Sequence, residues 1–562
     1  MQRIPLNSLF ALAVSAVLFA SNSWATPTIE TILYNGAVFT SDSKNPWVSA
    51  VAIDGSRFVK VGTDNEVLSS AGPETALIDL QGQTVIPGLN DAHAHIPVPF
   101  VLGTIVTPPI IPPDPGPSLP EIAALVETAA MALPPGNLIA GFIADAVFDN
   151  ENTTRNTLDA IAPNHPVLLF AASGTPLFIN TAAMAMFGIS ETEPDPAGGY
   201  FERDPDTGVI TGEARGYAAY RVIRALHAYF PDELLAEMYG AVLAALPQFG
   251  VTSIQEMPLW MSQAEARNIV ANIDLPIRIR LMCHPTSLNQ SRSDCMPPVF
   301  PGNGLFSSHG IKWHVDGSEY NGLAAVTEPY IEPAGTYGKL NFSEDELLHI
   351  VSDAVTWPFA IQQRMYHVIG DRGADALLQA MDAAAPSWLW RFLRTRMEHG
   401  DMIRRDQVPA LVDNNIVTVM SPLFMAPADV DIYRFGPDRA GEMYPLKSLR
   451  NAGVHVAFGT DFIGEPLSPF LNLMFAVTHP VNPKEAVTME EAVIMHTVES
   501  AYAEFQSFQK GKIKPGYLAD LAVLSQDIFS IPPMMVPDTF SLLTMVGGRI
   551  VFDAGVLSSR MK

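Results

Sequence analysis

Between residues 87 and about 501 the chain alternates short apolar, β-branched runs with longer segments whose apolar residues recur at helical spacing. Strands separated by helices pair in parallel and bury both faces, so this alternation favours a parallel sheet covered by helices. Roughly eight or nine such units over about 400 residues predict an α/β fold, namely a (β/α)8 or TIM barrel with insertions. The strand-like runs are 84–86, 167–170, 251–255, 277–282, 311–315, 361–368, 394–398, 417–420 and 454–458.

Both ends of the chain are typical of β-structure. Short β-type runs lie between residues 27 and 86, and Asp54-Gly55 between two of them is a strong hairpin signal. Similar runs occur at 521–524 and 542–552. Neither end holds enough strands to form a sheet alone, so we expect residues 26–86 and 505–562 to build one small β-sandwich domain beside a barrel domain at 87–504.

The first 25 residues have the pattern of a secretory signal. Arg3 is followed by an apolar run over 9–20 and by the small-residue cleavage site Ser23-Trp24-Ala25. The apolar run is shorter than the roughly 20 residues that a membrane-spanning helix needs. We therefore expect a mature chain that begins at Thr26 and is secreted across the inner membrane into the periplasm.

The net charge and the number of cysteines limit which partners and metal sites the chain can have. The 33 basic and 59 acidic residues give a formal charge of −26, and without a basic cluster nucleic acid is excluded as a partner. Cys283 and Cys295 are the two cysteines; in an oxidising compartment they can form a disulfide, and two free thiols are the alternative. Two cysteines cannot make a Cys-based zinc site, so any metal must bind histidine, carboxylate or a modified side chain.

His93 and His95 are the first candidate metal ligands. Residues two apart on a strand point to the same side, so both imidazoles can face one ion. They follow the strand-like run 84–86, and catalytic residues of a (β/α)8 barrel gather at such strand ends. A His-x-His pair can occur by chance in a chain with 13 histidines, so alone it is weak evidence for a metal site. Its position at a predicted strand end strengthens that evidence.

Residues 85–95 resemble the first strand motif of the amidohydrolase superfamily, in the branch that includes N-substituted formamide deformylases. The resemblance covers nearly the whole mature chain and implies the barrel and sandwich described above. Five further stretches match in order: 310–318 (lysine motif), 367–372, 396–399 (histidine motifs), 458–461 (aspartate motif) and 511–521 (return to the sandwich).

The resemblance also implies a metal site. A carbamate on Lys312 would bridge two ions, and the donor types suit Zn2+ or a similar ion. Without the carbamate, Lys312 pairs with Asp316 or Glu319 and one ion remains. Asp461 is then the catalytic base and acid. The implied metal ligands are His93, His95, Lys312, His367, His399 and Asp461.

Some positions depart from the family pattern and predict a different substrate. Thr175 stands where relatives often have His, and Ser421 where they commonly have Gln. His314 is either a pocket hydrogen-bond donor or a satisfied core histidine. Together with Arg372, these residues are our candidate substrate contacts. The apolar stretch 96–117 favours an apolar substrate group, unless it packs against a partner subunit.

We therefore expect a metal-dependent amidohydrolase that cleaves the C–N bond of a small N-acyl or N-substituted substrate with metal-activated water. Hydrolysis of an ester, lactone, cyclic amide or carbamate is the alternative within enzymes. A periplasmic binding protein of the same fold, without turnover, is the alternative outside them. The sequence predicts no membrane span in the mature chain and leaves a homo-oligomer open.

Overall fold

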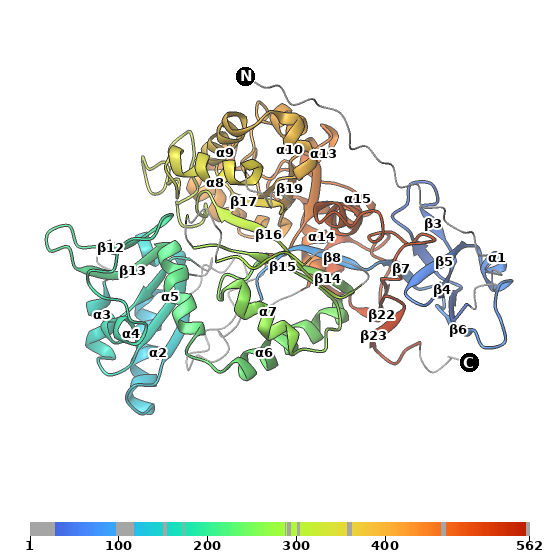
Figure 1. Cartoon of the computed structure of the whole chain (residues 1–562), viewed down its shortest axis with the longest axis horizontal. Coiled ribbons are helices and arrows are strands. Elements are labelled where there is room, and N and C mark those ends of the chain that lie inside the picture. Colours follow the sequence, from blue (N-terminus) through green and yellow to red (C-terminus); the bar gives the residue numbers. More distant parts are fainter. Residues whose placement is uncertain are drawn as a thin grey trace, which may run out of the picture.

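A computed structural model describes residues 29–96, 117–149, 154–171, 175–286, 288, 294–299, 304–356, 362–461 and 468–557. At its centre lies an eight-stranded parallel sheet that curls into a barrel (Figure 1). The predicted (β/α)8 fold is thus confirmed. In spatial order the strands are β8 (Leu89–Ala94), β14 (Val251–Glu256), β15 (Arg278–Cys283), β16 (Phe306–His314), β17 (Arg364–Val368), β18 (Arg396–His399), β19 (Val417–Met420) and β20 (His455–Phe458).

The barrel closes where the end of β20 meets the end of β8. The backbone N–H of Asp461 donates to the carbonyl of His93 at 2.8 Å. A Cβ atom on Gly459 would lie 2.4 Å from Cβ of His93, so a residue without a side chain is needed at this approach. Closure therefore places the first and last candidate ligands of the barrel beside each other.

Helices cover the outside of the barrel. In α9 (Asp371–Ala384) the residues Ala374, Leu377 and Met381 recur at helical spacing and are buried, as the sequence predicts. No helix in the described ranges is long and apolar enough to cross a membrane. The other helices of this region are α6 (Asp232–Ala245), α7 (Gln263–Ala271), α8 (Glu344–Thr356), α10 (Ser387–Leu393), α11 (Val408–Asn414), α12 (Ala428–Ala440), α13 (Leu446–Asn451), α14 (Pro469–Thr478), α15 (Met489–Ile494) and α16 (Ser500–Ala503).

A separate α/β unit, which we name the insertion, lies between β8 and β14 and forms one end of the molecule in Figure 1. Its five-stranded sheet has the order β12-β13-β11-β10-β9, so the assignment of 167–170 to the barrel was wrong. The elements are α2 (Leu119–Ala132), β9 (Ile139–Ile143), α3 (Arg155–Ile161), β10 (Val167–Ala171), β11 (Leu177–Ile179), α4 (Thr181–Met186), β12 (Gly199–Arg203), β13 (Ile210–Gly216) and α5 (Tyr217–His227).

Strand β10 shows why that assignment failed. Leu168 and Phe170 belong to the main hydrophobic core, whereas Leu169 packs into a second cluster on the other face of the strand. A strand buried on both faces is apolar throughout, whichever sheet it joins. Its sequence therefore predicts a buried strand and does not identify its neighbours.

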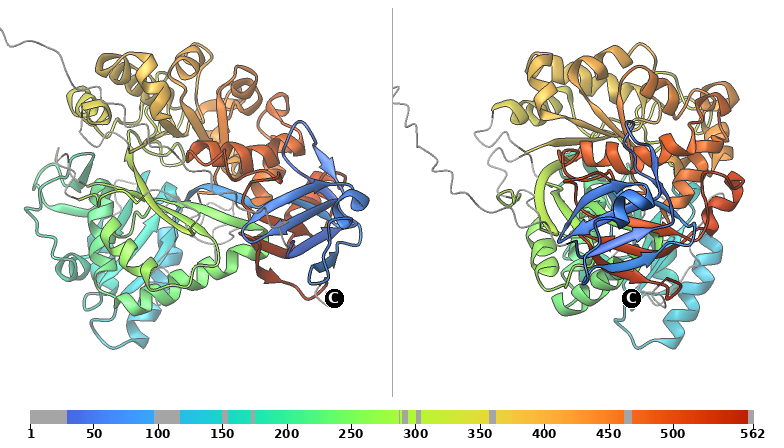
Figure 2. Two further views of the ribbon diagram at one scale, coloured as in Figure 1. Left: turned by 45° about the vertical axis from the view of Figure 1, so that its right-hand side comes forward. Right: turned by 90° about the vertical axis from the view of Figure 1, so that its right-hand side faces the viewer.

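The two chain ends pair as expected. Strand β7 (Thr84–Pro87) runs antiparallel to β21 (Leu521–Leu524), and the views in Figure 2 show the first and last strands side by side. The run 84–86 therefore belongs to the sandwich and not to the barrel. One sheet has the order β23-β22-β21-β7-β2-β3 and the other β5-β4-β1-β6. Their remaining elements are β1 (Thr31–Tyr34), β2 (Ala37–Phe39), β3 (Trp47–Val48), β4 (Ala50–Asp54), β5 (Arg57–Gly62), α1 (Asp64–Leu68), β6 (Ala76–Asp79), β22 (Ser541–Val546) and β23 (Arg549–Asp553).

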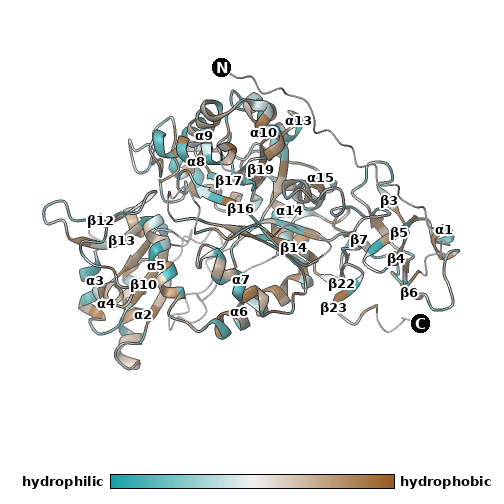
Figure 3. Cartoon of the chain, viewed as in Figure 1, coloured by the Kyte–Doolittle hydropathy of each residue, from teal (hydrophilic) through white to brown (hydrophobic). Residues whose placement is uncertain are grey.

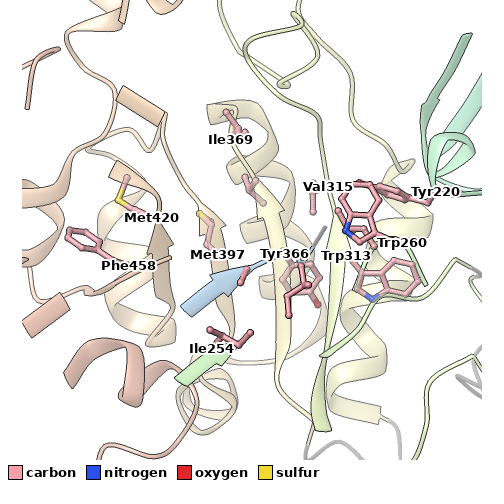
Figure 4. Packing of buried hydrophobic residues seen from close by; sticks show 14 of the residues in the cluster. Tyr220, Ile254, Trp260, Trp313, Val315, Tyr366, Ile369, Met397, Met420 and Phe458 are labelled. Carbon is pink, nitrogen blue, oxygen red and sulfur yellow. The ribbon is translucent and has the colours of Figure 1, made fainter. Parts of the chain in front are cut away.

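One hydrophobic core joins the barrel to the insertion. The strands of both units are largely apolar (Figure 3). Tyr220 of α5 lies beside Trp313 of β16 and Val315, which follows that strand (Figure 4), and all three are buried members of this core. The insertion is thus packed against the barrel on the side where β16 ends. Cys283, at the end of the neighbouring strand β15, forms a disulfide with Cys295.

Candidate metal centre

The candidate ligands come together at the end of the barrel where the strands finish. His93 and His95 lie at the end of β8, and Asp461 follows β20. The carboxyl ends of parallel strands meet at one face of a barrel, which is where this fold places its active sites. Lys312, His367 and His399 reach the same face from β16, β17 and β18.

Three of these side chains converge closely. The Nε2 atoms of His93 and His95 are 3.1 Å apart. Oδ1 of Asp461 lies 3.4 Å from the first and 3.2 Å from the second. In the described part of the chain, this is the one group of three or more possible ligands whose atoms all lie within 4.8 Å of one another.

The hydrogen positions on the two imidazoles follow from their outer partners. Nδ1 of His93 lies 2.8 Å from a carboxylate oxygen of Glu398, and Nδ1 of His95 lies 2.6 Å from the carbonyl oxygen of Met257. A carbonyl and an ionised carboxylate only accept, so each Nδ1 carries the hydrogen and each Nε2 presents a lone pair. Three acceptor atoms thus face one another with no hydrogen between them, an arrangement that a bound cation stabilises.

His367 and His399 extend this group. Their ring centroids are 4.4 Å apart, and Nε2 of His399 is 3.6 Å from Oδ2 of Asp461. Within the described ranges the Nε2 atoms of both histidines are buried and have no hydrogen-bond partner. Buried polar atoms normally have one, so these two imidazoles are available as ligands.

The protonation states suit metal binding, which requires neutral imidazoles and an ionised carboxylate. Burial lowers the pKa of His93 to about 4 and those of His367 and His399 well below their usual range.

Lys312 is fully buried, and its Nζ lies 3.4 Å from Nε2 of His93. Burial lowers the pKa of its amine to about 8. Among the described residues no ion pair joins Lys312 to Asp316 or Glu319, because the carboxylate of Asp316 instead accepts the backbone N–H groups of Ala325, Ile369 and Gly370. The lysine therefore faces the candidate ligands.

Glu398 is a residue of the site that sequence reasoning missed. Arg396 donates to both of its carboxylate oxygens at 2.7 and 2.8 Å. Burial opposes ionisation of Glu398, but Arg396 keeps its pKa far below the usual range. The ionised Glu398 therefore orients His93 through Nδ1. Its place next to His399 in the motif 396–399 was the available signal.

Two of the candidate ligand residues have unusual backbone conformations. The φ angles are +71° at His399 and +49° at Asp461, a region that residues other than glycine rarely adopt. Such strain is concentrated at functional sites, where the surroundings hold it in place. Near Asp461, the backbone N–H groups of His93 and Thr460 both donate to the carboxylate of Asp91, which supports both ends of the closure.

The four candidate substrate contacts have different surroundings. His314 is next to the site, with its ring centroid 4.7 Å from that of His367. Ser421 directly follows β19, and its buried Oγ has no partner in the described part of the chain. Thr175 accepts a hydrogen bond from Asn321 through its carbonyl, and the guanidinium of Arg372 donates to the carbonyls of Val326 and Tyr337. Their contact with substrate stays a prediction.

Two further predictions fall on segments that the described residues do not include. These are the signal sequence with its cleavage after Ala25 and nearly all of the apolar stretch 96–117, of which only Ile96 and Pro117 are described.

Comparison with known proteins agrees with this geometry. The model of the amidohydrolase family matches residues 76–552, a range that includes the barrel, most of the C-terminal β-sandwich segment and every candidate ligand. The chain belongs to the amidohydrolase family. It is 28% identical to the N-substituted formamide deformylase of Arthrobacter pascens over 561 residues, covering 93% of this chain and 98% of that one. The predicted family is thereby confirmed.

Solved structures of low sequence identity share the fold of this amidohydrolase. An uncharacterized metal-dependent hydrolase from Pyrococcus horikoshii OT3 superposes with a TM-score of 0.68 at 21% identity, covering 90% of this chain and 99% of that one. A variant of atrazine chlorohydrolase TrzN from Arthrobacter aurescens TC1, complexed with zinc and atraton, gives 0.52 at 14% identity over 93% and 95%. Membership of the family supports hydrolase activity for this protein.

Proposed function

We propose that this amidohydrolase cleaves the C–N bond of a small N-acyl or N-substituted compound with Zn2+ as its metal. The observation that carries the proposal is the triad of His93, His95 and Asp461, whose three acceptor atoms face one another without a hydrogen between them. Nitrogen and oxygen donors of this kind suit zinc. The zinc in the related TrzN variant supports the same choice.

A divalent ion bound here would lower the pKa of a water molecule and polarise the substrate carbonyl. The chain supplies orientation and proton transfer. His93 and His95 are locked by Glu398 and Met257, so their Nε2 lone pairs stay directed into the site. Asp461 takes the proton of the attacking water on a carboxylate oxygen and passes it to the departing nitrogen, which cannot leave as an anion.

Lys312 extends the site to two ions in this proposal. Its neutral amine adds to carbon dioxide, which forms an N–C bond and releases one proton. The resulting carbamate would offer oxygen ligands to a second ion held with His367 and His399. The burial of Lys312 and its approach to Nε2 of His93 support this role, since an ammonium group there would repel a cation.

The substrate and the location of the enzyme are also proposals. The name of the Arthrobacter pascens relative favours an N-formyl or similar N-acyl group. The disulfide between Cys283 and Cys295 is consistent with a chain that is exported into an oxidising compartment, as the first 25 residues predict.

Metal removal followed by controlled reloading tests the proposal. The protein is treated with a chelator, its metal content is measured by mass spectrometry, and Zn2+, Co2+ or Mn2+ is added back. Each form is assayed with matched N-formyl amines, N-acyl amines, esters, lactones and carbamates. We expect zinc to restore C–N hydrolysis. Hydrolysis of the esters alone, or activity that survives complete metal removal, would contradict it.

A further inference from the structure

A second histidine pair lies against the candidate metal ligands. His284 follows β15, His314 ends β16, and both are buried. Nε2 of His284 lies 2.9 Å from Nδ1 of His314. The ring of His314 is 4.7 Å from that of His367, so the pair adjoins the proposed ligands without belonging to the close triad.

The hydrogen between the two imidazoles can be assigned from the outer nitrogen of His284. Its Nδ1 is buried and has no hydrogen-bond partner among the described residues. A fully buried N–H without an acceptor is rare, and Nδ1 of His284 is such a fully buried atom whereas Nε2 of His314 is not, so Nδ1 of His284 is the bare nitrogen. The hydrogen of His284 is then on Nε2 and is donated to Nδ1 of His314.

This assignment decides what His314 can do. With its Nδ1 accepting, the neutral imidazole carries its own hydrogen on Nε2. A protonated nitrogen is a hydrogen-bond donor and cannot bind a metal. No hydrogen bond joins this Nε2 to another residue in the described part of the chain, so the donor is free to meet a ligand.

The insertion supplies a second donor beside the first. Tyr220 of α5 is 4% exposed, and its ring lies 4.8 Å from that of His284 and 5.4 Å from that of His314. None of the described residues makes a hydrogen bond to its hydroxyl group. Burial, Tyr217 and the Asp461 carboxylate raise the pKa of Tyr220 well above its usual range, so the hydroxyl keeps its proton.

The guanidinium group of Arg224 places a positive charge next to the histidine pair. Arg224, one turn further along α5, donates to the carbonyl of His284 at 2.6 Å and to Thr286 at 3.3 Å. A guanidinium group at this position favours an anionic oxygen over a neutral one. The chemistry therefore suits a carboxylate better than an apolar substrate group.

We propose that Nε2–H of His314 and O–H of Tyr220 form a two-donor subsite that binds a carboxylate of the substrate next to the bond to be cleaved. The proposal rests on the proposed function, because it places this carboxylate beside an N-acyl group held at the metal centre. His284 is a positioning residue, which acts by holding the hydrogen of His314 on Nε2.

A matched pair of substrates tests the subsite. N-formylphenylalanine and N-formylphenethylamine differ only in the carboxylate. With the zinc-loaded enzyme we expect the first to have a KM at least about tenfold lower, as hydrogen bonds to a charged group imply. Equal KM values for the two compounds would overturn the proposal, whereas a low KM for the carboxamide of the first would reassign the subsite to a neutral carbonyl.

Single-residue variants locate the effect. Tyr220→Phe should raise KM about tenfold more for N-formylphenylalanine than for N-formylphenethylamine. His284→Leu should act in the same way, and His284→Gln should restore binding because its amide can still donate to His314. Tyr229→Phe, which removes a hydroxyl from a residue that is 57% exposed, is the control. Equal losses for both substrates would contradict the subsite.

A binding experiment separates this proposal from the proposed function. If neither formamide is hydrolysed, the affinity of the zinc-loaded protein for phenylacetate is measured by calorimetry. About tenfold weaker binding to Tyr220→Phe than to wild type supports the subsite even without turnover. Identical affinities would overturn it. The 15N chemical shifts of labelled histidines provide a second readout, and an unprotonated Nε2 on His314 would contradict the assignment.

Discussion

Both ends of the barrel contain buried charged side chains, but the two ends differ in whether these side chains have hydrogen-bond partners. At the end where the strands begin, Arg278 donates to both carboxylate oxygens of Asp520 at 2.8 and 3.0 Å, and Lys510 pairs with Glu504. At the end where the strands finish, buried atoms of His367, His399 and Asp461 have no hydrogen-bond partner among the described residues.

This difference separates stability from function. A buried charge whose hydrogen bonds are complete stabilises one packing arrangement and has little capacity left for a ligand. A buried polar atom without a partner carries a desolvation cost that a bound group can remove. We therefore expect substitutions at the first end to change the free energy of unfolding and substitutions at the second to change metal binding and turnover.

The largest expected effect is on catalysis. Asp461→Asn keeps the size of the side chain but removes the group proposed to transfer protons, so kcat should fall about 10²–10⁴-fold. The midpoint of thermal unfolding should change little. Asp520→Asn is the matched control at the other end of the barrel. It should lower the midpoint of thermal unfolding and leave kcat unchanged. Full turnover by Asp461→Asn would remove its catalytic role.

Arg278→Met tests the stability end. It leaves the buried carboxylate of Asp520 without its cation, and breaking such a pair costs about 3–5 kcal/mol of unfolding free energy. Denaturant titration measures the loss, and kcat per folded molecule should be unchanged. The double variant Arg278→Met with Asp520→Leu should recover part of the stability. A lowered kcat in folded Arg278→Met would contradict the separation of stability and catalysis between the two ends of the barrel.

Glu398→Gln should have an intermediate effect. The amide cannot hold His93 as an anion does, so metal affinity should weaken about 10–100-fold, as for other groups that orient a metal-bound histidine. Competition with a chelator of known affinity measures it. Because Arg396 loses its carboxylate partner too, Glu398→Asp serves as a control that keeps the charge. Unchanged affinity in Glu398→Gln would show that His93 does not need this partner.

The smallest expected effect is on activation by carbon dioxide. The pKa of Lys312 is lowered to about 8, so its neutral, reactive form increases as the pH rises from 7 to 8.5. At a fixed concentration of dissolved carbon dioxide, the rate at which zinc activates the metal-free protein should increase roughly five- to tenfold over this range. Lys312→Met should show no dependence on carbon dioxide. If the activation rate of the wild type does not depend on the concentration of carbon dioxide, the result contradicts the carbamate.

Local spacing explains which parts of this molecule were predictable. His93 and His95 share a strand end two residues apart, and the alternation of strands and helices predicts the barrel that carries them. Glu398 was harder to identify because neighbours on a regular strand point to opposite sides. The positive φ of His399 breaks that rule, and both Glu398 and His399 contact His93.

The insertion was the least predictable part. Its strand β10 has the same apolar character as a barrel strand, and pairing with β9 and β11 depends on residues distant in sequence. Nor does any pattern in α5 indicate that Tyr220 reaches the histidines after β15 and β16. That contact depends on how the insertion packs against the barrel, which the periodicity of the sequence does not describe.

The closure of the barrel between β8 and β20 also has a consequence for biosynthesis. Asp91 and Thr460, which hydrogen-bond across this closure, are 369 positions apart in the sequence. A growing chain therefore carries His93 and His95 for most of its synthesis before Asp461 emerges from the ribosome. Because the triad cannot form earlier, firm retention of the proposed metal would belong to the final stage of folding, and an exported chain would acquire that metal in the compartment where folding is completed.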